Sequence, residues 1–319
     1  MSILAPGPAP ASIRVGTAGW SYPHWNGLVY PRTPWPGFHA LEVIAKHLDT
    51  VEINSSFYQQ LKPEVVKLWI KKVSANPEFL FTAKLNQRFT HNRVLEDADV
   101  AGFKTGLAPL VQAKKLGAVL MQFPWSFRFT SENREFFIRL RRAFHEYPLV
   151  AEMRHASWMS EEAIGTFLDY HVGFCNIDQP AYTSAMPPTA FLTSQVGYVR
   201  LHGRNPRNSL GGFERVAQGT DQSGTRTRQH DYLYPEAELA EWVQRTQHAG
   251  RFADRTFVIF NNDAAGKSFV NALQAQAALK GVRGAAPKEL RRRYPVELEH
   301  FGPRGAEQQW LFPAEHEAA

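Results

Sequence analysis

Charged residues end several short apolar segments of this chain, and the clearest of these segments is 149–155, Leu-Val-Ala-Glu-Met-Arg-His. If the segment is a β-strand, alternate residues share a face, so Glu152 and Arg154 point the same way. Two opposite charges on one face of an otherwise apolar strand are unusual in simple packing. They predict a polar site at the end of this strand.

The same pattern recurs in other apolar segments, and counting alternate residues selects the side chains that would face a common centre. These are Glu52, Asn54, Thr82, Lys84, Gln122, Glu152, Arg154, Asn176, Asp178, Arg200, His202, Phe260 and Asn262. Any single pair of opposite charges could be a structural ion pair. Burying isolated charges costs several kcal/mol each, so the whole set favours a functional site.

Five of these residues are candidate catalytic groups. Glu52 and Glu152 are candidates for general acid and base, because two carboxyl groups in different surroundings can hold different protonation states. Lys84 could stabilise developing negative charge, and His202 could transfer a proton. Asp178 completes the catalytic set. The candidate substrate-binding residues are Trp20, Asn54, Tyr58, Gln122, Arg154, Trp158, Arg200, Arg204 and Asn262.

A divalent metal is one possible ligand of these residues. Glu52, Glu152, Asp178 and His202 suit Mg²⁺ or Mn²⁺, but they lie on different strands beside three cations, so no metal or other cofactor is expected.

Phosphate is the more specific idea, because barrels often bind it after the last two strands, near a helix N-terminus. Gly203, Gly266 and Lys267 occupy such positions. The Gly-Lys-Ser run at 266–268 is not a P-loop, because Asn261 stands where that motif needs glycine. A close approach of the chain at Gly266 is the alternative.

The composition limits the class of protein. The chain has 319 residues, 44% hydrophobic residues and a formal net charge of +6. Its single cysteine, Cys175, cannot form an internal disulfide and is expected to be a buried thiol. No apolar run approaches the ~20 residues that span a bilayer, and residues 1–12 do not resemble a secretory signal, so a cytoplasmic protein with no membrane partner is expected.

Strand and helix patterns alternate along the chain. The expected strands are 13–18, 50–54, 79–85, 118–123, 149–154, 172–178, 196–202 and 256–262. The expected helices are 37–48, 63–75, 100–116, 131–145, 160–170, 236–249 and 266–279, with Ser131 and Ser160 as N-caps.

Eight β/α units predict a single-domain (β/α)8 barrel over residues 13–280. Residues 1–12 would be a disordered lead-in, 203–233 a long loop and 281–319 an irregular extension. An open doubly wound sheet is the alternative, but the first strand lacks the glycine-rich turn of that fold.

Several motifs resemble one family. They are Val15-Gly-Thr-Ala-Gly-Trp-Ser-Tyr22, Val51-Glu-Ile-Asn-Ser-Ser-Phe-Tyr58, Phe81-Thr-Ala-Lys84, Gln122-Phe-Pro124, Glu152-Met-Arg-His155 with Trp158, Arg200-Leu-His-Gly-Arg204 and Phe260-Asn-Asn262. In this order, over about residues 13–279, they resemble the YecE-like family, domain of unknown function 72. The resemblance implies a TIM-type barrel and no established reaction.

Three functions compete at this point. The first is an enzyme that hydrolyses or isomerises a polar anionic small molecule, such as a sugar or sugar phosphate, by acid/base chemistry. The second is a nucleic-acid-binding or nucleic-acid-processing protein, suggested by the basic charge and the arginines of the long loop. The third is a ligand-binding module without catalysis. The oligomeric state stays open.

Overall fold

A computed structural model describes residues 12–205, 230–281 and 283–302 of the chain. The expected lead-in therefore lies outside the described residues except for Ser12. The same holds for residues 206–229 of the long loop and 303–319 of the C-terminal extension.

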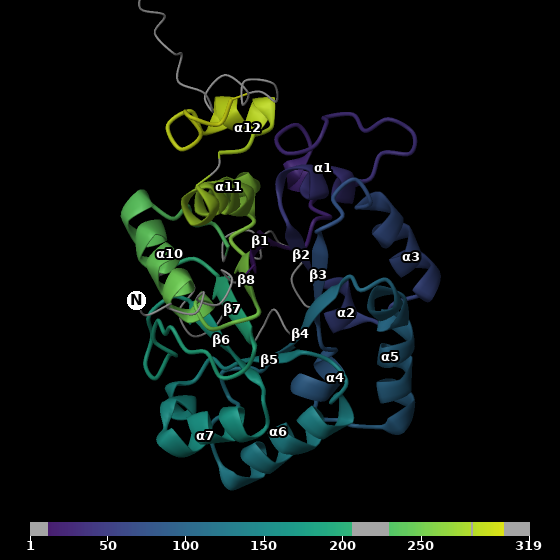
Figure 1. Cartoon of the computed structure of the whole chain (residues 1–319), viewed down its shortest axis with the longest axis vertical. Coiled ribbons are helices and arrows are strands. Elements are labelled where there is room, and N and C mark those ends of the chain that lie inside the picture. Colours follow the sequence, from purple (N-terminus) through teal and green to yellow (C-terminus); the bar gives the residue numbers. More distant parts are fainter. Residues whose placement is uncertain (1–11, 206–229, 282, 303–319) are drawn as a thin grey trace, which may run out of the picture.

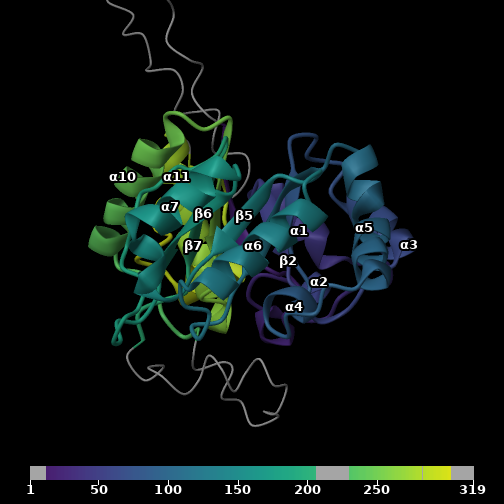
Figure 2. The same cartoon turned by 90° about the horizontal axis from the view of Figure 1, so that it is seen from below.

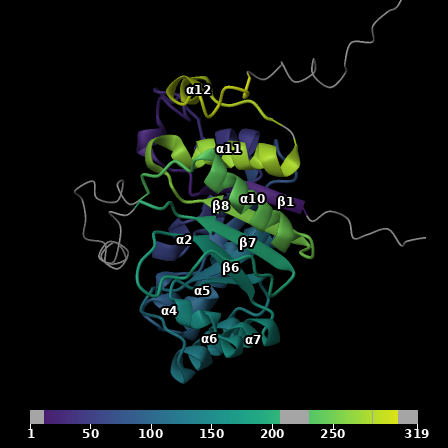
Figure 3. The same ribbon diagram turned by 90° about the vertical axis from the view of Figure 1, so that its left-hand side faces the viewer.

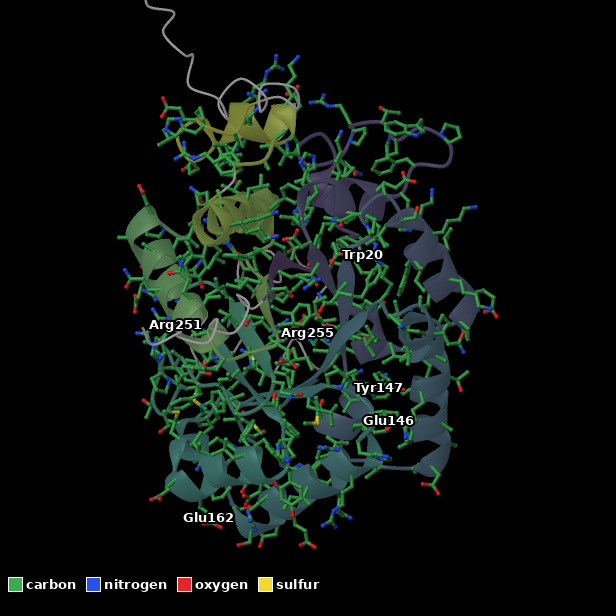
Figure 4. All side chains as sticks on the ribbon, in the orientation of Figure 1. Trp20, Glu146, Tyr147, Glu162, Arg251 and Arg255 are labelled. Carbon is green, nitrogen blue, oxygen red and sulfur yellow. The ribbon has the colours of Figure 1, made fainter. Side chains whose placement is uncertain are left out.

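Eight parallel strands form a closed barrel in the order of the chain, and β8 pairs with β1 (Figure 1). The strands are β1 Ser12–Ala18, β2 Thr50–Ile53, β3 Leu80–Lys84, β4 Leu116–Gln122, β5 Leu149–Glu152, β6 Gly173–Asp178, β7 Val196–Leu201 and β8 Arg255–Phe260. The prediction of a (β/α)8 barrel is confirmed. Its interior is filled by side chains (Figure 4), as expected of a barrel of this size.

Helices surround the barrel, as Figures 1 and 2 show. The longer ones are α1 Ala40–His47, α3 Pro63–Lys72, α5 Asp97–Gln112, α6 Ser131–Ala143, α7 Glu161–Asp169, α10 Glu236–Gly250 and α11 Lys267–Lys280. The short ones are η1 Pro23–Trp25, α2 Ser55–Tyr58, α4 Gln87–Thr90, η2 Ala156–Met159, η4 Ala264–Gly266 and α12 Lys288–Arg293. In the described part of the chain, no helix is both long and apolar enough to cross a bilayer.

The helix caps correct one expectation. Ser160 caps α7, since its side chain accepts a hydrogen bond from the backbone N–H of Ala163. The prediction that Ser131 caps α6 is wrong. The cap is Thr130, whose hydroxyl accepts from the N–H of Asn133, so Ser131 is the first residue of the helix itself.

The C-terminal segment packs beside α11, with α12 next to that helix in Figures 1 and 3. Leu290 of α12 is fully buried, and the Tyr294 hydroxyl donates a hydrogen bond of 2.8 Å to the carbonyl of Ala265. These contacts place α12 over the start of α11.

The strand register decides which side chains enter the barrel, and it contradicts the alternation expected for β6. Residues paired in a parallel sheet lie on the same face. Ile177 pairs with Arg200, and Asp178 pairs with Leu201. Since Arg200 points inward, Cys175 and Ile177 also point inward, whereas Asn176 and Asp178 face the helices.

The same error affects β8, where Ile259 pairs with Arg200 and Phe260 with Leu201. Phe260 and Asn262 therefore face outward, contrary to the prediction. Asn262 is fully buried there, and its Nδ2 donates hydrogen bonds to the Tyr232 carbonyl and to Asn271 Oδ1. It holds two segments outside the barrel together and does not reach the mouth.

Candidate functional site

A network of buried charges lies inside the barrel near the carboxyl ends of the strands. At its centre Arg200 of β7 contacts Glu52 of β2 through Nε–Oε2 (2.9 Å) and Nη2–Oε1 (2.7 Å). The Nη1 atom of Arg200 lies 2.8 Å from Oε2 of Glu152 in β5. Arg200 is 1% exposed and both glutamates are 0% exposed. The guanidinium group of Arg200 thus joins three strands through charge-assisted hydrogen bonds to both glutamates.

Arg154 and His202 complete this network around Glu152. Nη2 of Arg154 lies 2.7 Å from Glu152 Oε1, and Nε2 of His202 lies 3.3 Å from the same oxygen. Asn261 Nδ2 is 3.0 Å from His202 Nδ1. Arg154 Nη2 and Arg200 Nη1 each lie 3.4 Å from His202 Nε2, so both ring nitrogens of His202 have polar neighbours. We call Glu52, Lys84, Glu152, Arg154, Arg200 and His202 the central cluster.

The surroundings set the protonation of these groups. Burial opposes ionisation of Glu152, but Arg200, Arg154 and His202 outweigh it and hold the pKa of Glu152 well below its usual range. Burial lowers the pKa of His202 to about 3, so its imidazole is neutral at neutral pH. Glu152 is consequently ionised at neutral pH, whereas a general acid must be protonated there.

Lys84, at the end of β3, differs from the other cations of the central cluster. It is 8% exposed, and its Nζ makes neither a hydrogen bond nor an ion pair with any described residue. Instead, Nζ lies 4.1 Å from the ring centre of Phe57. Burial, followed by the charge of Arg200, lowers the pKa of Lys84 to about 7. Lys84 can therefore exchange a proton at neutral pH.

His91 stands next to Lys84, although no sequence pattern pointed to it. Its ring packs edge-on against Phe57, with centres 5.0 Å apart. Burial, then Lys84 and Arg154, lower the pKa of His91 to about 4. It follows the short helix α4, where no periodic pattern exists to reveal it.

A cavity of about 450 Å³ opens at the barrel mouth, between the connections that follow β1, β2 and β8. Its walls include the predicted residues Trp20, Asn54 and Tyr58. Tyr58 also packs against Phe57, with ring centres 5.0 Å apart. Asn261 lines the cavity as well, so the His202 hydrogen bond connects the cavity to the central cluster.

Further polar groups of the cavity come from connections that the sequence did not indicate. His24 Nε2 lies 3.0 Å from the carbonyl of Asp263 and 3.4 Å from its carboxylate, and both residues line the cavity. Asn261 was also missed, because the predicted alternation along β8 is one residue out of phase.

Gln122 and Trp158 were both expected to bind substrate, and the structure separates them. Gln122 pairs in register with Glu152, so it faces the barrel interior. Its Oε1 is buried and accepts no hydrogen bond from the described residues. Trp158 is fully buried among helices, where its indole donates to the Phe127 carbonyl at 2.7 Å and stacks on the Phe127 ring. Trp158, expected to bind substrate, therefore packs between helices and does not line the cavity at the barrel mouth.

Asp178 and Arg204 form a separate cluster outside the barrel wall. Arg204 Nε lies 3.0 and 2.9 Å from the two oxygens of Asp178. Arg204 also forms ion pairs with Glu238 and Glu241 of α10. Asp178, expected to be catalytic, and Arg204, expected to bind substrate, therefore lie apart from the central cluster. The two side chains connect β6 to α10.

The residues of the predicted phosphate site are engaged with other groups of the protein. The N–H of Gly203 donates to the Tyr234 hydroxyl at 2.8 Å, and Lys267 Nζ pairs with Asp231 at 2.5 Å. A Cβ at Gly266 would lie 3.0 Å from Leu290, so α12 covers this helix start with an apolar side chain.

The sequence suggested Glu52, Glu152, Asp178 and His202 as possible metal ligands, but Asp178 lies outside the barrel and apart from the other three. Within residues 12–205, 230–281 and 283–302, no three His, Cys, Asp or Glu side chains form a group that could hold a metal. Cys175 is fully buried, and burial raises the pKa of its thiol.

Comparison with known proteins places the chain in a family. Residues 14–293 match the model of the protein family of unknown function DUF72. The UPF0759 protein YunF of Bacillus subtilis is 27% identical over 87% of this chain and 99% of its own length. The UPF0759 protein YecE of Escherichia coli is 32% identical, over 36% of this chain and 39% of its own length. A crystal structure of a DUF72 family protein from Enterococcus faecalis has a TM-score of 0.71 at 26% identity, covering 84% of this chain and 95% of that one. The chain therefore belongs to the DUF72 family.

Proposed function

We propose that this protein is an enzyme that transfers protons on a small anionic substrate at the barrel mouth, with Lys84 as the base. The observation that carries the proposal is the state of Lys84. It is a buried amine without an ion pair among the described residues, beside two arginines, with a pKa of about 7. Buried lysines of this kind are suited to general-base catalysis.

The glutamates of the central cluster are poorly suited to the same role. Both oxygens of Glu52 accept hydrogen bonds from Arg200, and the oxygens of Glu152 contact Arg200 and Arg154. Glycoside hydrolysis by a carboxyl pair needs one protonated acid with a raised pKa. Because the pKa of Glu152 is lowered, proton abstraction, as in an isomerisation, fits the central cluster better than hydrolysis.

The charges of the central cluster favour an anionic substrate. When Lys84 is protonated, the central cluster holds three cations, on Lys84, Arg154 and Arg200, and two carboxylates, on Glu52 and Glu152. The imidazoles of His202 and His91 add no charge at neutral pH, because their pKa values are about 3 and about 4. An incoming carboxylate or phosphate would offset this excess positive charge. It would also stabilise the protonated form of Lys84 after proton abstraction.

The cavity next to the central cluster suits the uncharged part of a sugar-like molecule. Trp20, Tyr22 and Tyr58 supply aromatic rings that can stack on sugar rings. Asn54 and Asn261 supply amides for hydroxyl groups. We therefore propose a sugar phosphate or sugar acid as the substrate class.

Hydrogen exchange tests this proposal even when the product is unidentified. The protein is incubated with aldose and ketose phosphates and sugar acids in D₂O, and NMR follows deuterium incorporation next to the carbonyl group. We expect incorporation that Lys84→Met abolishes and that Lys67→Met, on the exposed face of α3, leaves unchanged. The rate should increase through pH 7, since the base must be deprotonated. Exchange that survives in Lys84→Met would overturn the assignment.

A further inference from the structure

We propose that Lys84 is a covalent site, at which Nζ forms an imine with the carbonyl carbon of an anionic aldehyde or ketone. The inference rests on the proposed function, because it concerns the same site, and it names the reacting group of the substrate. Its geometric basis is a buried amine at the end of β3 whose Nζ lies 4.1 Å from the centre of the Phe57 ring and forms no ion pair with any described residue.

Lys84 stands apart from the other lysines of the protein. It is the one buried lysine in the part of the chain that the structure describes. Lys72, Lys104 and Lys280 lie on the outside and are held by Glu42, Glu146 and Asp49. An amine must be unprotonated to attack a carbonyl, and an ion pair opposes that state.

The surroundings of Lys84 favour the unprotonated amine. The Phe57 ring removes water from one side, and burial is the largest cause of the lowered pKa. Arg200 and Arg154 lower it further by repulsion. Desolvation and neighbouring cations are the two effects known to activate imine-forming lysines.

The chemistry balances without an oxidant or reductant. The Nζ lone pair attacks the carbonyl carbon, a C–N bond forms, and the carbonyl oxygen takes up a proton while Nζ loses one. The hydroxyl group then takes up a second proton and leaves as water while the nitrogen lone pair forms the C=N bond, and the nitrogen releases its remaining proton to give the neutral imine. The products are one imine and one water for each amine and carbonyl.

Neighbouring groups can support both steps. His91 is neutral at pH 7 and packs on the same Phe57 ring, and Thr90 occupies its Nδ1, which leaves Nε2 for proton transfer. Glu52 and Glu152 favour a positive charge at Lys84, so they would also stabilise a protonated imine.

Reductive trapping tests the inference on the unmodified protein. The full-length protein is treated with glyoxylate, a small anionic aldehyde, and sodium borohydride at pH 7.5, and peptide mass spectrometry locates the carboxymethylated lysines. We expect labelling of Lys84 on the order of tenfold above that of the exposed Lys67, because burial lowers the pKa of Lys84 and leaves much of its amine unprotonated at pH 7.5. Labelling of Lys84 should level off above pH 7, where its amine is already unprotonated. The neutral acetaldehyde should label Lys84 less than glyoxylate does.

The outcomes separate this inference from the proposed function. Equal labelling of Lys84 and Lys67, or no labelling of Lys84, overturns the imine. If Lys84→Met nevertheless abolishes deuterium incorporation, the proposed function survives with Lys84 as a base alone. Selective labelling without deuterium incorporation on any sugar supports the covalent site and overturns the proposed proton transfer.

Discussion

Replacing Lys84 by methionine should make this protein more stable while removing its proposed activity. Lys84 is 8% exposed and has no ion pair with the described residues to offset the loss of hydration. Methionine keeps most of the length of the side chain and packs adaptably against Phe57. The variant removes an amine whose charged form is unfavourable in the folded state.

The magnitude follows from the pKa of Lys84. One pKa unit corresponds to about 1.4 kcal/mol. A decrease from 10.5 to about 7 makes the charged amine about 5 kcal/mol less favourable in the folded than in the unfolded chain. Below pH 7 both states are protonated and the full penalty applies. Between pH 7 and 10.5 only the unfolded state holds the proton, so the penalty decreases and the wild type gains stability as pH increases.

Urea denaturation at several pH values measures this effect. We expect Lys84→Met to raise the free energy of unfolding by about 3–5 kcal/mol at pH 6 and by about 2 kcal/mol at pH 9, following the linkage of the lowered pKa. The control Lys67→Met, at an exposed position of α3, should change it by less than about 0.5 kcal/mol at either pH. A variant less stable than the wild type at pH 6, or a difference that does not vary with pH, would refute the reasoning.

Three further substitutions test the structural roles. Arg200→Met leaves two buried carboxylates without their shared partner and should cost about 3–5 kcal/mol in urea denaturation, whereas Arg245→Met, which breaks a partly exposed i,i+4 pair, should cost under about 1 kcal/mol. Equal effects would contradict the buried network. Trp158→Ala should lower the free energy of unfolding by about 3–5 kcal/mol, since the indole is fully buried, and a cost below about 1 kcal/mol would argue against its packing role. Gly203→Ala should destabilise the fold by over about 1 kcal/mol in the same assay, because φ is +91° and the new Cβ would lie 2.6 Å from Tyr232; a neutral effect would contradict this backbone geometry.

The sequence predicted the barrel because the strand signal in this chain is local. Each strand is a short apolar segment rich in β-branched and aromatic residues, and helical periodicity fills most of the intervals. Every expected strand overlaps an observed one. The N-cap of α6 was missed because Thr130 and Ser131 are adjacent and both suit that position.

The sequence predicted the inward-facing residues on those strands where inward and outward side chains alternate up to the last residue. Glu52, Lys84, Glu152 and Arg200 lie on such strands and meet inside the barrel. Both faces of β6 and β8 are buried, as in β2, β5 and β7, but at β6 and β8 the polar residues expected to face inward lie on the outward face, so polarity alone did not reveal the inward one. Asp178 was expected to face inward because a charged residue in a buried strand suggested a site. It faces outward instead, and its burial there is possible because Arg204 neutralises its charge.

The sequence by itself determined the fold class and identified Glu52, Lys84, Glu152 and Arg200 as polar side chains that face the barrel interior. The tertiary structure alone decided which of those groups meet, and therefore which of them can exchange protons. Glu152 and Lys84 both end apolar strands, but Glu152 received two arginine partners, whereas Lys84 received an aromatic ring. The pKa of each group depends on burial and on charges carried by strands distant in the chain, and those distances exist only after the barrel closes.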